Sequence, residues 1–179
     1  MTSPTASAPV GEPAGETFDT FTAVFTEIDA AKAANVKRPE FGTLVDKLSD
    51  AITKAKETAK TPAGSETLDG YAQVLQIYKD SIALWDIKLR LPEMAEVAEK
   101  AIKQKTAAGA PDTDPEIMKG YDFNIATLSG IPLQQYPSGD TGVEAFATKY
   151  ALPITDRNGW RIVPSDSVSL VWKKASDKL

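Results

Sequence analysis

The feature that most constrains the fold is a row of apolar residues at alternating three- and four-residue spacing. The row consists of Leu68, Tyr71, Leu75, Tyr78, Ile82, Trp85 and Leu89. Because residues three and four apart share one face of an α-helix, this spacing predicts a long amphipathic helix. Three further apolar residues, Val74, Ile77 and Leu84, widen this face, so the helix should contact more than one neighbour. Ser65 or Thr67 is expected to cap its N-terminus.

Three further segments show the same helical spacing. Residues 16–34 carry a stripe of Phe18, Phe21, Phe25 and Ile28, and residues 40–60 carry a second stripe with Phe41, Leu48 and Ile52. Pro92 is expected to end or bend the long helix and to open a fourth one. Four consecutive amphipathic helices with short links predict an antiparallel four-helix bundle over residues 16–110.

The pattern changes after residue 110. Residues 111–179 contain long irregular stretches, short helical patterns at 115–128 and 142–150, and a last helical pattern after Ser165. Asn158-Gly159 lies between two short apolar runs, which is a strong signal for a β-hairpin. The sequence therefore predicts a mainly α fold: the bundle, with an irregular α+β portion packed on it as part of one compact domain.

The composition excludes several classes of function. The 179-residue chain has no Cys and no His, which removes Cys/His zinc sites, thiol nucleophiles and His-based catalytic triads. Its net charge of −5 argues against nucleic acid binding. No apolar run approaches the length of a transmembrane helix. We therefore expect no enzyme activity, no cofactor and no metal site.

Two acidic motifs have structural interpretations. Asp140-Thr141-Gly142 matches the aspartic-protease signature, but a Pro-Ser-Gly stretch precedes it where that site needs an apolar strand, so a turn or helix cap is favoured. Residues 112–116 place carboxylates at alternate positions, as a calcium loop does, but the Gly and Glu required later in an EF-hand are absent. A helix cap before Pro115 is the better interpretation, and weak calcium binding is the alternative.

Four aromatic residues are the candidate contact residues for a protein partner or a ligand. Tyr121, Phe123, Tyr136 and Trp160 lie in or beside predicted loops; the alternative is that they cover the open end of the bundle. Tyr71, Tyr78 and Trp85 could line a ligand groove, but their heptad spacing favours packing between helices. Residues 111–142 hold five acidic groups and one Lys, which suits a partner with a basic surface; the alternative is that these carboxylates belong to solvated loops.

The first fifteen residues indicate a location. They are rich in Pro, Ser, Thr, Ala and Gly and too poor in large apolar side chains to fold, which predicts a disordered tether over residues 1–15. The segment resembles the tether that follows the lipidated Cys of mature bacterial lipoproteins, with Met1 standing where the processed chain would begin. The alternative is an incidental disordered terminus. This resemblance implies an extracytoplasmic location, in the periplasm or cell envelope, and a lipid anchor on the natural N-terminus.

Three functions are consistent with these observations. The first is a non-catalytic, extracytoplasmic module that binds a protein partner. The second is a helical protein that binds a small molecule or glycan in a pocket lined by Tyr78, Trp85 or Trp160, which requires a cavity above roughly 300 Å³. The third is a carboxylate-dependent hydrolase with two carboxyl groups in one cleft. The first is preferred because catalytic groups are lacking.

Overall fold

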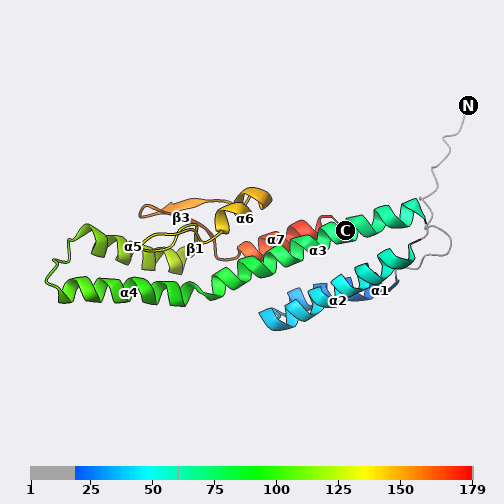
Figure 1. The fold of residues 1–179 in the computed structure, drawn as a ribbon, viewed down its shortest axis with the longest axis horizontal. Helices are drawn as coiled ribbons and strands as arrows, with labels where there is room; N and C mark the ends of the chain where they lie inside the picture. The colour runs from blue at the N-terminus through cyan, green and yellow to red at the C-terminus, as the bar shows by residue number, and fades with distance from the viewer. Residues whose placement is uncertain (1–18, 60, 179) are drawn as a thin grey trace, which may run out of the picture. The chain divides into compact units, whose positions relative to one another are not determined.

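The computed structural model describes residues 19–59 and 61–178 (Figure 1). Its helices are α1 (Asp19–Ala33), α2 (Arg38–Thr58), α3 (Pro62–Leu89), α4 (Leu91–Ala107), α5 (Pro115–Ser129), α6 (Val143–Tyr150) and α7 (Ser167–Ser176). Its strands are β1 (Gly130–Pro132), β2 (Thr155–Arg157) and β3 (Trp160–Pro164). The predicted mainly α fold with a β-hairpin is confirmed. The predicted tether and Phe18 lie outside the described residues.

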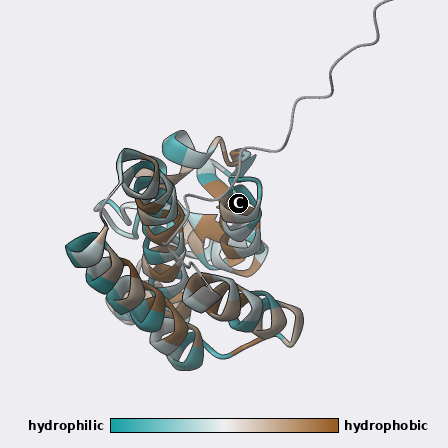
Figure 2. Cartoon of the chain, turned by 90° about the vertical axis from the view of Figure 1, so that its right-hand side faces the viewer, coloured by the Kyte–Doolittle hydropathy of each residue, from teal (hydrophilic) through white to brown (hydrophobic). Residues whose placement is uncertain are grey.

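The chain forms two compact units. The boundary between them along the sequence falls between Leu75 and Gln76, inside α3. The sequence pattern, in contrast, changes character near residue 110. The helices carry both apolar and polar residues along their length, as expected for amphipathic helices (Figure 2).

In the first unit, α1 and α2 pack against each other through their predicted apolar stripes. Ile28 of α1 and Phe41 and Leu48 of α2 are completely buried. Tyr71, in the N-terminal half of the long helix, packs at a tilt against two rings of α1: its ring centroid lies 4.9 Å from that of Phe21 and 5.3 Å from that of Phe25. Tyr71 is therefore a packing residue, as its spacing predicted.

The long helix begins earlier than expected. It starts at Pro62, and the hydroxyl oxygen of Thr61 accepts a hydrogen bond from the backbone N–H of Gly64 at 3.0 Å. The prediction that Ser65 or Thr67 caps this helix is wrong, because Pro fits the first turn of a helix, where its missing N–H costs nothing.

In the second unit, the C-terminal half of α3 packs against α7. Tyr78 is fully buried. The Trp85 and Trp172 rings meet edge to face with centroids 5.6 Å apart, and Trp172 Nε1 donates a hydrogen bond to Ser81 Oγ at 2.9 Å. Trp85 thus packs between α3 and α7, as its heptad spacing predicted, and Tyr78 lies in the interior.

The fourth helix does not return along the third. Only Arg90 separates α3 from α4, and its backbone is helical (φ −86°, ψ −5°), so the chain bends and continues instead of reversing (Figure 1). A reversal between helices needs a loop of roughly two to five residues. Pro92 therefore opens a helix that packs against α5, and the antiparallel pairing predicted for the fourth helix is replaced by an α4–α5 hairpin.

The small sheet is antiparallel, with strand order β1-β3-β2. Asn158 and Gly159, with φ of 53° and 82°, form the predicted tight turn between β2 and β3. The third strand, β1, was not predicted. It depends on Gly130, where a Cβ atom would lie 2.3 Å from the carbonyl oxygen of Val163, so only glycine permits this approach of the two backbones.

Candidate partner-binding surface on α5

Three of the four predicted contact residues form one buried aromatic cluster in the second unit. Phe123 is fully buried, and Tyr136 and Trp160 are each 5% exposed. The ring centroid of Phe123 lies 4.8 Å from that of Trp160 and 6.1 Å from that of Tyr136. These rings fill the space between α4, α5 and the sheet, together with Ala98 and Ile162. The alternative considered for these residues was that they cover the open end of the bundle; the structure places three of them in this cluster between α4, α5 and the sheet.

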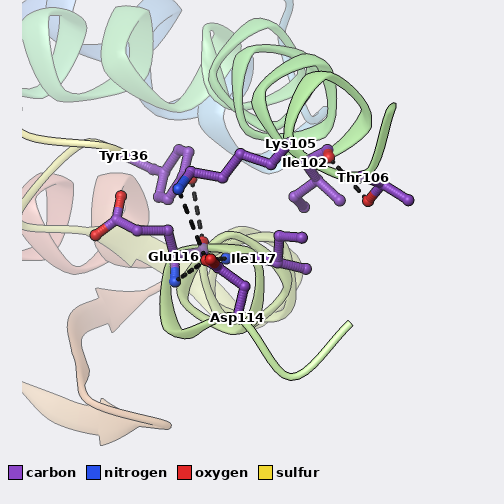
Figure 3. Close-up of polar contacts among 7 residues, drawn as sticks. All are labelled: Ile102, Lys105, Thr106, Asp114, Glu116, Ile117 and Tyr136. Carbon is purple, nitrogen blue, oxygen red and sulfur yellow. Dashed lines mark hydrogen bonds and ion pairs between the residues drawn. The ribbon is translucent and has the colours of Figure 1, made fainter. Parts of the chain in front are cut away.

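The cluster is fixed to the α4–α5 hairpin by polar contacts (Figure 3). The Tyr136 hydroxyl donates a hydrogen bond to the carbonyl oxygen of Glu116 at 3.1 Å. Burial, followed by the charge of Glu116, raises the pKa of Tyr136 against an opposing effect of Lys105. Asp114 Oδ1 accepts hydrogen bonds from the backbone N–H groups of Glu116 and Ile117 and lies 3.7 Å from Lys105 Nζ. The predicted helix cap before Pro115 is confirmed.

Tyr121 is separate from this cluster. It lies on the outer face of α5 and is 47% exposed. Three more large apolar side chains are exposed on the same helix: Met118 at 48%, Ile125 at 48% and Leu128 at 87%. Their spacing from Met118 through Tyr121 and Ile125 to Leu128 is three, four and three residues, so they share one face of the helix. We call these four residues the α5 stripe.

The opposite side of α5 is packed. Ile117, Gly120, Phe123 and Ala126 are buried, and α5 contacts α4 and all three strands. Gly120 marks a close approach to α4, because a Cβ atom there would lie 2.9 Å from the Ile102 side chain. α5 is therefore apolar on two sides, of which one forms the core and the other is exposed.

Four acidic residues lie close to the N-terminal half of the α5 stripe along the chain. Asp112, Asp114 and Glu116 lie at the N-terminal end of the helix, and Asp122 lies beside Tyr121 in the sequence. Asp122 Oδ1 accepts a hydrogen bond from the Asn158 side chain at 2.9 Å, which ties this carboxylate to the hairpin turn. The exposed apolar face thus has a negative border.

The single lysine of residues 111–142, Lys119, lies on another face of α5 than the stripe. Lys119 Nζ lies 5.7 Å from the ring centroid of Trp160, on the sheet side of α5. A helical position one residue after Met118 is turned by about 100° from it. The positive charge of Lys119 is therefore on a different face from the α5 stripe.

A polar groove of about 430 Å³ lies beside the aromatic cluster. Among its lining residues are Lys119, Gln134, Gln135, Asp140, Glu144 and Trp160. The two carboxylates have other partners in the fold: Glu144 Oε1 is 3.0 Å from Arg161 Nη1, and Asp140 Oδ1 accepts a hydrogen bond from the Gly142 backbone at 2.8 Å.

The Asp140-Thr141-Gly142 motif forms a turn before α6, as predicted. Thr141 is buried, and its hydroxyl lies 2.8 Å from the carbonyl oxygen of Pro132 and 2.9 Å from that of Leu133. The motif therefore connects β1 to α6. Within residues 19–59 and 61–178, no group of three or more acidic side chains is placed to hold a metal ion.

Sequence reasoning identified Tyr121 but not the α5 stripe. The apolar residues of this segment fall on both sides of the helix, and periodicity alone does not say which side is covered. The signal in the sequence that indicates the stripe is a second row of apolar residues at positions 118, 121, 125 and 128, beside the row that is buried.

Comparison of the chain with family models, with curated proteins and with solved structures found no match. Within the described part of the chain, no helix combines the length and apolar character needed to span a membrane.

Proposed function

We propose that this chain is a non-catalytic binding module that docks a protein partner through the α5 stripe. The observation that carries the proposal is the exposure of four large apolar side chains in a row on a helix whose other side is packed. Contiguous exposed apolar surface on a folded protein marks interaction sites.

The energetics and the shape of this face favour a protein partner. Burying one large apolar side chain contributes about 1.5–3 kcal/mol, so covering Tyr121, Ile125 and Leu128 together contributes several kcal/mol. The outer face of a helix is convex, whereas small molecules bind in concave pockets. Another helix or a groove on a protein complements such a face.

Site-specific photocrosslinking in cells of the natural source tests this function. A photoreactive amino acid replaces Ile125 in one full-length chain and Val97 in another. Val97 is the matched control, because it is an apolar residue with 51% exposure that lies on α4, outside the α5 stripe. We expect a discrete protein adduct from position 125 that is absent from position 97 and is lost when Leu128→Gln is added. Equal adducts at both positions, or none at 121, 125 and 128, would contradict the proposal.

We further propose that the module works outside the cytoplasm, held by a lipid anchor. Support comes from the small-residue composition of residues 1–15, which resembles the tether that follows the lipidated Cys of mature bacterial lipoproteins; in the natural protein that Cys would stand just before Thr2. Fractionation of the source cells tests this: the natural protein should be found with the envelope and should incorporate labelled palmitate. Recovery in the cytoplasmic fraction would contradict it.

The polar groove beside Trp160 supports binding of a small molecule or glycan as a second function. At about 430 Å³ it exceeds the size that such a ligand requires. Titration with a panel of mono- and disaccharides, followed by amide chemical shifts, should then move the signals of Gln134 and Gln135. Unchanged shifts across the panel would remove this function.

A further inference from the structure

We propose that the partner element which docks on the α5 stripe is an amphipathic helix with lysine and arginine side chains bordering its apolar face. This inference rests on the proposed function and specifies the partner of the same surface. It follows from the geometry of the stripe and from the charges around it.

The geometry of the stripe suits a helix. The exposed row spans eleven residues from Met118 to Leu128, and its two ends lie about 15 Å apart along the helix axis. A row at three- and four-residue spacing forms a ridge that packs into the groove of a second helix. Two to three turns of a partner helix would match this length.

The charges favour a basic partner. Asp112, Glu116 and Asp122 lie near the stripe, and Lys119, the only basic residue of the 111–142 segment, lies over Trp160 on the sheet side. Lys105 approaches Asp114 to 3.7 Å and offsets part of this charge. Lysine or arginine residues at the edges of the partner's apolar face would complement the remaining carboxylates.

A second copy of this chain is disfavoured as the occupant. An antiparallel pair of α5 stripes related by a two-fold axis between Tyr121 and Ile125 would bring the two Asp122 carboxylates close to that axis. Like charges facing each other destabilise such an interface. The chain's own residues 1–18 are also disfavoured, because they contain two glutamates and no lysine or arginine.

A membrane surface is disfavoured for the same electrostatic reason. Anionic lipids attract basic segments and repel acidic ones. The negative border of the α5 stripe is therefore matched to a basic protein helix and not to an anionic bilayer.

Fluorescence anisotropy with three labelled synthetic peptides tests the inference on the full chain. The first peptide is an 18-residue amphipathic helix with leucines at three- and four-residue spacing and lysine and arginine on the other faces. The second has glutamate in place of the basic residues, and the third has the composition of the first with its leucines shuffled. We expect the first peptide to bind, and the other two to bind at least about tenfold more weakly.

Variants localise the binding. Ile125→Gln with Leu128→Gln should weaken binding of the basic peptide at least about tenfold, whereas Val97→Gln should leave it unchanged. Asp122→Asn and an increase in salt should each weaken it several-fold, because both reduce the electrostatic attraction. Circular dichroism of each variant checks that the fold is retained.

Several outcomes would overturn the inference. If cellular crosslinks at residue 125 are found but the basic peptide does not bind, the docking function stands and the basic helix is wrong. Equal binding of the acidic peptide has the same meaning. Concentration-dependent dimers in sedimentation that are lost in Ile125→Gln would make the occupant a second copy, and stripe-dependent binding to phosphatidylglycerol vesicles would make it a membrane.

Discussion

The hydroxyl of Tyr150 donates a hydrogen bond to Asp80 Oδ2 at 2.6 Å, which joins α6 to the C-terminal half of α3. The same carboxylate accepts hydrogen bonds from Lys149 Nζ at 2.6 Å and from the Gln76 side chain at 2.8 Å. Burial raises the pKa of Asp80, but the hydrogen bonds from Lys149, Tyr150 and Gln76 outweigh it, and the net pKa lies below its ordinary value of 3.8. Burial and the bond to Asp80 raise the pKa of Tyr150.

The Asp80 carboxylate should make the unfolding free energy depend on pH in the acidic range. Because the pKa is lowered by folding, its contribution is complete above the ordinary pKa of 3.8 and is lost as pH falls through the lower folded value. Asp80→Asn should therefore lower the unfolding free energy at pH 7 by about 1–3 kcal/mol, with a smaller difference below pH 3. Urea unfolding at a series of pH values measures this. A difference that stays constant down to pH 2 would show that the carboxylate charge does not contribute.

Tyr150 should make the unfolding free energy depend on pH in the alkaline range. Its pKa is raised by folding, so its stabilising contribution is complete below the ordinary pKa of a tyrosine and is lost as pH rises towards the folded value. Tyr150→Phe should lower stability by about 1 kcal/mol at pH 7, and its disadvantage should shrink above pH 10. Tyr121→Phe is the matched control, because Tyr121 is exposed, and it should match the wild type at neutral pH. Parallel curves for Tyr150→Phe and wild type would contradict this.

Two helical glycines should respond oppositely to alanine. At Gly70 an added Cβ atom meets nothing within 4 Å, so Gly70→Ala should raise the unfolding free energy by about 0.5–1 kcal/mol. At Gly120 the added atom meets Ile102 at 2.9 Å and Tyr136 at 3.4 Å, so Gly120→Ala should lower it by about 1–3 kcal/mol. Chemical unfolding of both variants tests the packing of α4 on α5. A stabilised Gly120→Ala would mean that the two helices are further apart than described.

The four aromatic residues first considered as contacts should separate into two classes. Phe123→Ala removes the centre of a buried cluster and should cost about 3–5 kcal/mol. Tyr136→Phe removes only the hydrogen bond to Glu116 and should cost about 1 kcal/mol. Tyr121→Ala should change stability by about 0.5 kcal/mol or less, because its side chain is half exposed. Equal losses at Tyr121 and Phe123 would contradict the separation.

Helices and the hairpin could be predicted because their signals are local. The three- and four-residue spacing from Leu68 to Leu89 predicted the long helix. Asn158-Gly159 predicted the tight turn, in which both residues have positive φ angles. The cap at Asp114 follows from its own side chain and the two N–H groups after Pro115.

Long-range relationships could not be predicted in this way. Whether Arg90 forms a reversal or a bend depends on which helix covers α4, and that helix is α5. Strand β1 is three residues long and pairs with β3, some thirty residues later. The exposed side of α5 is likewise decided by α4 and the sheet, which cover its other sides. These features are set by packing between segments far apart in the sequence.

The most direct test of the account is the unfolding free energy of a chain with Tyr121→Gln, Ile125→Gln and Leu128→Gln together. Glutamine is a good helix former, so the substitutions remove apolar surface without penalising α5. If the α5 stripe is held open for a partner, this variant should be as stable as the wild type to within about 1 kcal/mol. A loss of about 3 kcal/mol or more would show that the chain itself covers the stripe, and would contradict the assignment of this face to a partner.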